Sequence, residues 1–238
     1  MKDIDFSQYK FRCSGLKNLM TKPKTIKERE SGELSQTAKT YLKDIFIEEV
    51  YGRHRPEIGT GATKKGTMVE PDSFDLSNQV YGETHFKNKV HFENDYIKGT
   101  PDDVCKEDLV IDFKSNWDIW TFSAIDYETA RKAYYYQILG YMWLTEKNHG
   151  ELRFALVNTP EEIIQKELYR LSFSILDLNG VGPEAEEAQN KLRVNYIFDD
   201  IAPEKRIKKF KFDMNLVDVE DVKSTVIRAR EYLSSISL

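Results

Sequence analysis

One stretch of seven residues, Leu109–Ser115, constrains the fold more than any other part of the sequence. Apolar and polar residues alternate along it, as they do in a β-strand whose two faces meet different surroundings. Ile111 and Phe113 are expected on a buried face, while Asp112 and Lys114 are expected side by side on the other face. Helical patterns occur before and after this strand, and helices packed on a sheet would cover its buried face. We therefore predict an α/β protein.

A turn precedes this strand at Gly99-Thr100-Pro101-Asp102. Asp102 lies ten residues before Asp112, and a hairpin that closes between Cys105 and Asp108 would place the two carboxylates side by side, next to the Lys114 ammonium group. Oxygen ligands of this kind hold Mg²⁺ or Mn²⁺. Such an ion neutralises charge on a phosphate and lowers the pKa of a bound water, and a lysine nearby stabilises the transition state. Phosphodiester hydrolysis needs a group of this kind, although the alternating strand taken alone is more typical of a solvent-facing edge.

The rest of the chain reads as a mixture of helices and short strands. Ser35 is the predicted cap of the first long helix, with Ser31 as an alternative. A Gly-, Thr- and Lys-rich loop is predicted over residues 53–65, and a break in regular structure over residues 179–183. By periodicity, helices are predicted over residues 34–50, 66–81, 127–147 and 219–236 and after Thr159, and further strands over residues 91–93, 96–98, 152–157 and 207–212.

Composition excludes several classes of protein. The sequence has 35 basic and 40 acidic residues, and this net charge of −5 argues against non-specific coating of nucleic acid. It does not exclude a catalyst that contacts a few phosphates, because attraction depends on the local field. No run approaches the roughly 18 apolar residues of a membrane-spanning helix. The first 30 residues contain no apolar segment typical of a secretion signal.

Cysteine and histidine are too few and too scattered to predict a soft-metal centre. Cys13 and Cys105 cannot form a disulfide framework, a four-cysteine zinc site or an iron–sulfur cluster, and a reducing cytoplasm is the simplest location. The histidines show neither HxH nor HExxH spacing, so each is expected to be a surface or core residue and not a zinc ligand. They are His54, His85, His91 and His149.

Pro101-Asp102 followed by Asp112-Phe113-Lys114 resembles the PD-(D/E)XK nuclease signature. Three further motifs resemble elements of the YqaJ-like and lambda-type phage exonucleases of the RecB-like branch. They are Gly66-Thr-Met-Val-Glu70, Tyr134-Tyr-Tyr-Gln137 with Tyr141, and Arg12-Cys13-Ser14. The resemblance covers residues 12–141, and it implies a restriction-endonuclease-like core: a central mixed β-sheet flanked by α-helices. We expect a single domain over residues 1–238, with a motif-bearing core at about 10–160 and a C-terminal elaboration at about 160–238.

The resemblance also implies a role for each matching residue. Asp102, Asp112, the Phe113 carbonyl and Glu70 would bind Mg²⁺, with Mn²⁺ as an alternative. Lys114 would position or activate the attacking water, and Gln137 would hold Lys114 or the scissile phosphate. Arg12, Ser14 and Tyr141 would contact DNA, the first two at a phosphate, for which the terminal phosphate of the strand is a candidate. Asp103 is an alternative to Asp102 as the metal ligand, although Asp102 is the residue that follows proline.

On this basis we predict a Mg²⁺-dependent deoxyribonuclease, in particular an exonuclease acting on linear duplex DNA in a prokaryotic or phage-infected cytoplasm. A single-strand annealing recombinase is a candidate partner, and relatives that encircle DNA allow a homo-oligomer. The alternatives are a catalytically silent DNA-binding scaffold, a sequence-specific endonuclease of the same fold, and a phosphatase of small molecules. The basic run at residues 205–211 either contacts DNA or protects an edge strand with lysines, while Phe210 and Phe212 face inward.

Overall fold

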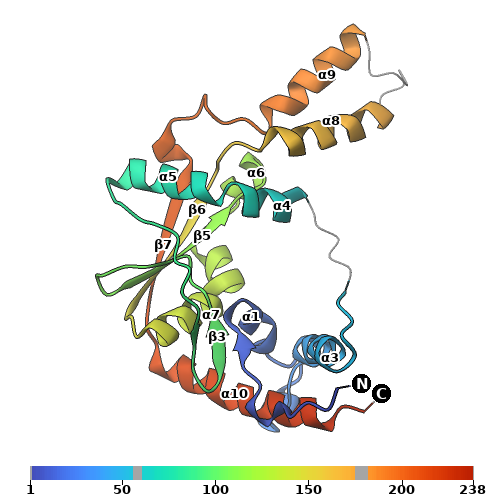
Figure 1. The fold of residues 1–238 in the computed structure, drawn as a ribbon, viewed down its shortest axis with the longest axis vertical. Helices are drawn as coiled ribbons and strands as arrows, with labels where there is room; N and C mark the ends of the chain where they lie inside the picture. The colour runs from blue at the N-terminus through green and yellow to red at the C-terminus, as the bar shows by residue number, and fades with distance from the viewer. Residues whose placement is uncertain (1, 56–60, 175–181, 238) are drawn as a thin grey trace.

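A four-stranded mixed β-sheet lies at the centre of the computed structural model (Figure 1), which describes residues 2–55, 61–174 and 182–237. The strand order is β4-β5-β6-β7, and a smaller sheet has the order β1-β3-β2. The strands are β1 (Phe11–Arg12), β2 (Phe92–Glu93), β3 (Ile97–Gly99), β4 (Asp103–Val104), β5 (Leu109–Ser115), β6 (His149–Ala155) and β7 (Ile207–Asp213).

Helices account for most of the remaining described residues. The longest are α3 (Gln36–Tyr51), α5 (Glu70–Tyr81), α7 (Tyr127–Thr145), α8 (Glu161–Ser174), α9 (Pro183–Val194) and α10 (Leu216–Ser235). The shorter ones are α1 (Leu16–Leu19), α2 (Ile26–Glu30), α4 (Gly61–Met68) and α6 (Ile119–Ser123), with 3₁₀ turns at Phe6–Gln8, Cys13–Gly15 and Pro203–Lys205. Within the described ranges, no helix is long and apolar enough to cross a membrane.

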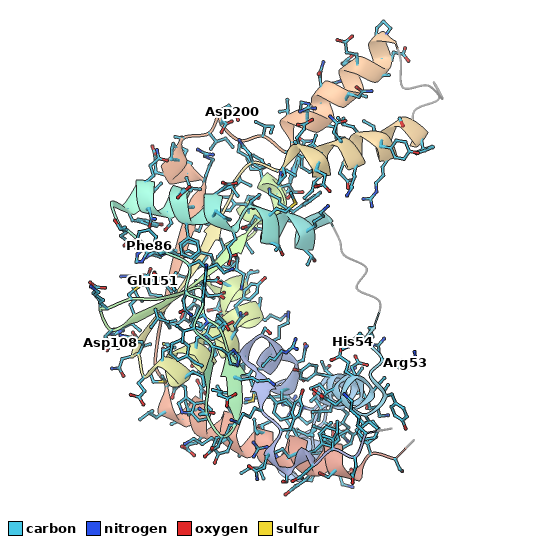
Figure 2. All side chains as sticks on the ribbon, in the orientation of Figure 1. Arg53, His54, Phe86, Asp108, Glu151 and Asp200 are labelled. Atoms are coloured by element: carbon cyan, nitrogen blue, oxygen red, sulfur yellow. The ribbon has the colours of Figure 1, made fainter. Side chains whose placement is uncertain are left out.

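The central sheet contains both antiparallel and parallel strand pairs. β4 and β5 form the predicted antiparallel hairpin, with Asp103 opposite Ile111, and Asp108 marks its tip in Figure 2. β5 and β6 are parallel, so the chain must cross over between them, and α7 is part of that crossover. β7 returns antiparallel to β6.

Four layers result. α5 packs on one face of the central sheet and α7 on the other, while α1, α3 and α10 form a further layer against α7. Figure 1 shows α10 along one end of the molecule and the α8–α9 hairpin projecting from the opposite end. The main core lies between the sheet and α7, where Leu152 and Phe154 are buried together with Ile138 and Met142. Each such side chain contributes roughly 1.5–3 kcal/mol when fully buried.

The smaller sheet joins the N-terminal segment to the rest of the fold. β1 runs parallel to β3, which places Arg12 opposite Lys98, and β2 forms a hairpin with β3. The side chain of Cys13 packs closely over Gly99 and Gly140, where a Cβ atom would lie about 3.0 and 2.9 Å from the sulfur. This contact fixes the N-terminal segment against α7.

Several boundaries differ from those predicted. α4 begins at Gly61, inside the predicted loop, and the single helix expected over residues 66–81 is divided between α4 and α5. Pro71 explains the division, because proline has no amide hydrogen to continue the helical bonding pattern. α9 was not predicted at all, since it has few apolar residues and only Ala185 is buried. Residues 56–60 of the predicted loop and 179–181 of the predicted break lie outside the described residues.

The basic run at residues 205–211 is partly engaged within the protein. The Lys208 ammonium donates hydrogen bonds to the backbone carbonyls of Phe122, Ser123 and Ile125 at 2.7–3.1 Å. Phe212 is buried, and β7 is the last strand of its sheet. These contacts favour the interpretation that residues 205–211 form a protected edge strand over the interpretation that they contact DNA.

Candidate active site

The β4–β5 hairpin brings two carboxylates together beside the central sheet. Asp102 immediately precedes β4, and its Oδ2 atom accepts a hydrogen bond of 2.7 Å from the backbone N–H of Phe113. Asp112 is in the middle of β5, and only 2% of its surface is exposed. The contact with the backbone next to Asp112 explains why Asp102 is held beside the strand that carries the second carboxylate.

Lys114 completes the predicted group. Its ammonium nitrogen lies 2.6 Å from Asp112 Oδ2, because residues two apart on a strand share a face. The same nitrogen lies 5.0 Å from the centre of the Tyr134 ring, over its face. Burial alone lowers the pKa of the Lys114 ammonium, but the contact with Asp112 outweighs burial and the pKa is raised. Lys114 is therefore a cation held in a fixed direction.

Gln137 links helix α7 to these strand residues. Its Nε2 atom donates hydrogen bonds to Asp112 Oδ1 at 3.3 Å and to the Tyr141 hydroxyl at 3.1 Å. The spacing of four residues places Gln137 and Tyr141 on one face of α7. The amide therefore reaches Lys114 through the Asp112 carboxylate that both contact. Tyr141 is only 6% exposed, so it supports Gln137 and presents little surface to a nucleic acid.

Glu70 reaches the site from the opposite layer of the fold. It is the first residue of α5, where a carboxylate is favoured by the positive end of the helix dipole. Its carboxylate forms an ion pair with Lys87, from the segment between α5 and β2. Lys87 was not predicted as a site residue, because nothing in its local sequence shows that the chain returns to Glu70.

A cleft of about 440 Å³ contains all of these groups. Its lining includes residues that the sequence analysis did not select, among them Thr67, Lys87, Ser115 and Asn116. Asn116 directly follows β5 and continues the two-residue spacing of Asp112 and Lys114. This spacing is a sequence signal that would have identified Asn116 as a residue of the cleft. Among the described residues, no donor reaches its buried Oδ1 atom.

The electrostatics of the cleft favour a divalent cation. Burial and the charge of Asp112 raise the pKa of Asp102 to about 8. Asp112 Oδ2 is buried, and within the described residues it makes only the ion pair with Lys114, with no hydrogen bond of normal geometry. A cation between the carboxylates would relieve their repulsion and compensate their burial. The donors are all oxygen atoms, so the site fits Mg²⁺ or Mn²⁺.

A second, basic pocket adjoins the cleft at Tyr141, which lines both. This pocket has a volume of about 360 Å³ and contains Arg12, Ser14, His91 and Lys98. Arg12 and Ser14 are exposed, and no described acidic residue forms an ion pair with Arg12 or Lys98. The structure thus places Arg12 and Ser14 near the carboxylates but in a neighbouring pocket.

Comparison with known proteins identifies solved structures that this chain resembles. No family model and no curated protein sequence matches the chain. Among solved structures, a phage-related exonuclease from Haemophilus somnus 129PT is 27% identical and superposes with a TM-score of 0.77, over 95% of this chain and 94% of that one. This similarity fits the PD-(D/E)XK nuclease superfamily, which the sequence motifs resemble. Within it, the chain fits the YqaJ-like, lambda-type exonuclease branch, and the similarity supports a nuclease function.

Two other solved structures share the fold of this chain at lower identity. The alkaline exonuclease LHK-Exo from Laribacter hongkongensis is 12% identical, with a TM-score of 0.62 over 96% of this chain and 90% of that one. The same exonuclease in complex with dAMP is 13% identical, also with a TM-score of 0.62, over 95% and 88% of the two chains. At this identity the likeness shows the fold alone. The predicted fold class is thereby confirmed.

Proposed function

We propose that this protein is a Mg²⁺-dependent exonuclease that hydrolyses phosphodiester bonds of linear DNA. The observation that carries the proposal is the convergence of Asp102, Asp112 and Lys114 in one cleft, next to a basic pocket. Two acidic groups and one ammonium provide what phosphodiester hydrolysis requires: oxygen ligands for a cation and a positive charge directed at the reacting phosphate.

Asp102 and Asp112 would hold the cation, with Glu70 and the Phe113 carbonyl as further ligands. A bound Mg²⁺ or Mn²⁺ supplies charge neutralisation at the phosphate and lowers the pKa of water. Glu70 must then exchange part of its contact with Lys87 for the cation. Lys87 would remain in the cleft as a second positive charge near the phosphate.

The remaining side chains of the cleft would position the reacting groups and stabilise charge on the phosphate. Lys114 is anchored by Asp112 and by the ring of Tyr134, so its ammonium can orient an attacking water and stabilise negative charge on the phosphate. Gln137 holds the Asp112 carboxylate through one oxygen, which leaves the other directed at Lys114. Fixing these groups in advance lowers the reorganisation needed during the reaction.

The basic pocket favours an exonuclease over an endonuclease. Arg12 and Ser14 provide a fork of N–H donors and a hydroxyl, groups that bind a phosphate well. A terminal phosphate held there would place the end of a strand one pocket away from the carboxylates. The structures that resemble the chain are themselves named exonucleases, which supports this subtype.

The direct test compares three end-labelled substrates: linear duplex, closed-circular duplex and single-stranded DNA, each with Mg²⁺ and with EDTA. We expect Mg²⁺-dependent degradation of linear DNA and none of closed circles. Cleavage of closed circles would indicate an endonuclease. Degradation that is equally fast with EDTA would exclude the metal mechanism. No hydrolysis of any DNA would favour the silent scaffold or, if simple phosphate esters are hydrolysed, a phosphatase.

A further inference from the structure

A second cluster of metal-ligating side chains lies outside the cleft. It consists of His85, Asp103 and Cys105, whose ligand atoms all lie within 4.8 Å of one another. His85 belongs to the segment between α5 and β2, next to Phe86, which is labelled in Figure 2. Cys105 packs in an apolar cluster with Phe74 of α5, on the sheet face opposite α7. The cluster therefore lies on the other side of the sheet from Asp112, the predicted Mg²⁺ ligand on β5.

We propose that His85, Asp103 and Cys105 bind a zinc ion. Imidazole nitrogen, carboxylate oxygen and thiolate sulfur are the three donor types that zinc uses in proteins, whereas Mg²⁺ requires oxygen ligands. This site is chemically unlike the cleft, and the inference does not depend on the proposed nuclease function. It departs from the sequence-based expectation that no histidine of the chain is a zinc ligand.

The distances between the donor atoms fit a tetrahedral ion with little movement. In the structure, Cys105 Sγ lies 3.7 Å from His85 Nδ1 and 3.5 Å from Asp103 Oδ2. Tetrahedral zinc with ordinary bond lengths places a sulfur about 3.6 Å from a nitrogen or oxygen ligand. The His85 Nδ1 to Asp103 Oδ2 distance is 2.6 Å, and it must open to about 3.3 Å, the separation that two nitrogen or oxygen ligands have around zinc.

The other side of the imidazole ring has the partner that a zinc-binding histidine needs. His85 Nε2 lies 3.0 Å from Glu83 Oε2, and Glu83 in turn accepts a hydrogen bond of 2.5 Å from the buried guanidinium of Arg153. Metal-binding histidines almost always donate their second ring N–H to such a carboxylate, which fixes the tautomer and the ring direction. Here Nε2 faces Glu83, and Nδ1 is the ring atom directed at Asp103 and Cys105, where it would coordinate the ion.

A zinc ion at this position would fasten the segment that borders the cleft. Two residues after His85, Lys87 forms the ion pair with Glu70. Next to it, the Asn88 N–H donates a hydrogen bond of 2.6 Å to the backbone carbonyl of Asp102. Zinc would thus join this segment to β4, directly beyond the predicted Mg²⁺ ligand. Three protein ligands leave a fourth position for water.

The test uses purified full-length protein, stripped of metal and then titrated with ZnCl₂ or CoCl₂ in the presence of millimolar MgCl₂. We expect one equivalent of zinc per chain by elemental analysis. With Co²⁺ we expect the near-ultraviolet charge-transfer absorption that a thiolate ligand produces. Zinc should raise the thermal midpoint by roughly 5–10 °C at about 100 times its dissociation constant.

Matched variants assign the site. Cys105→Ala and His85→Gln should lose the bound equivalent and the midpoint shift, and Cys105→Ala should lose the absorption. Cys13→Ala, at the other buried cysteine, and His149→Gln, at a surface histidine that also contacts an aspartate, should keep all three. Asp112→Asn should keep them too, because the proposed site does not use the cleft.

The absence of a thiolate band in the wild-type protein would overturn the proposal without reliance on any variant. So would a band that persists in Cys105→Ala. In either case, His85 and Asp103 form a hydrogen-bonded pair and no metal site. Neither result bears on hydrolysis of DNA in the cleft, which has its own test.

Discussion

Asp102 and Asp103 are adjacent in the chain, yet their carboxylates belong to different clusters on opposite sides of the central sheet. Asp102 accepts the Phe113 N–H and lines the cleft, whereas Asp103 lies 2.6 Å from His85 Nδ1. Successive side chains of an extended backbone point in opposite directions, and this alternation separates the two acids. Of the two candidate ligands left open by the sequence, only Asp102 faces Asp112, so we retain Asp102 in the proposed metal site.

Replacing the strand lysine tests the catalytic role of the cleft. We expect Lys114→Ala to lower the rate of DNA hydrolysis at least about 100-fold, because a charge directed at the transition state contributes about 10²–10³ in rate. Lys211→Ala is the matched control, since that lysine is on β7 and its side chain is 76% exposed. Initial rates on linear duplex measure the effect, with circular dichroism to verify the fold. Equal rates for Lys114→Ala and wild type would remove Lys114 from the mechanism.

The basic pocket leads us to expect that the protein recognises phosphorylated DNA ends. Arg12→Ala should reduce hydrolysis of DNA with phosphorylated ends much more than of the same DNA with dephosphorylated ends, because only the former offers a terminal phosphate to the guanidinium. Lys17→Ala, an exposed cation of α1, should reduce neither selectively. The readout is the ratio of kcat/KM for the two substrates. An unchanged ratio in Arg12→Ala would place the terminal phosphate elsewhere.

Asp102 should impose a pH dependence on the stability of the metal-free protein. Burial and the charge of Asp112 raise its pKa from 3.8 to about 8, so the folded state holds the proton more tightly than the unfolded chain. This contribution to stability is complete below pH 3.8 and is lost as the pH rises to about 8. Between pH 5 and 8, the free energy of unfolding in urea and EDTA should therefore decrease more for wild type than for Asp102→Asn.

Asp108 provides the control for this titration. Hydrogen bonds from Asn148 lower its pKa, so its contribution is present above pH 3.8 and is lost only as the pH falls through a lower value. Asp108→Asn should therefore leave the difference in stability between pH 5 and pH 8 unchanged. Identical slopes for wild type and Asp102→Asn would show that Asp102 is ionised throughout this range.

The buried guanidinium of Arg153 should be essential to stability. It is fully buried and donates hydrogen bonds to Glu151, Ser77 and Glu83 at 2.5–2.9 Å. Arg153→Met leaves Glu151, which is only 4% exposed, without its main partner. We expect a loss of about 3–5 kcal/mol in the free energy of unfolding, the usual effect of breaking a buried ion pair.

Arg193→Met provides the comparison, because Arg193 pairs with Glu161 at the surface in the α8–α9 hairpin. Its effect on stability should be much smaller, since solvent and salt screen an exposed pair. Urea unfolding followed by circular dichroism measures both variants. Comparable losses in the two would mean that Glu151 finds another partner, with Lys209 and Lys211 at 3.8–3.9 Å as the candidates.

Local patterns predicted the elements that carry the site. Alternation along Leu109–Ser115 placed Asp112 and Lys114 on one face, and the turn before it placed Asp102 beside them, as the structure has them. The sequence also offered two caps for the first long helix, and Ser35 is the one whose hydroxyl accepts the Ala38 N–H. Such features depend on neighbours a few residues away, and periodicity reports those neighbours directly.

What the tertiary structure alone decided is which distant residues meet. The pairing of Glu70 with Lys87, the contact of Arg153 with Glu83, and the approach of His85 to Cys105 join residues 17–70 positions apart in the sequence. No local period encodes these contacts, because they arise when helix α5 and the segment after it fold back over the sheet. The sequence by itself thus determined the strand that carries Asp112 and Lys114, because its alternation is local. Packing determined the charged surroundings of that strand and brought His85, Asp103 and Cys105 together.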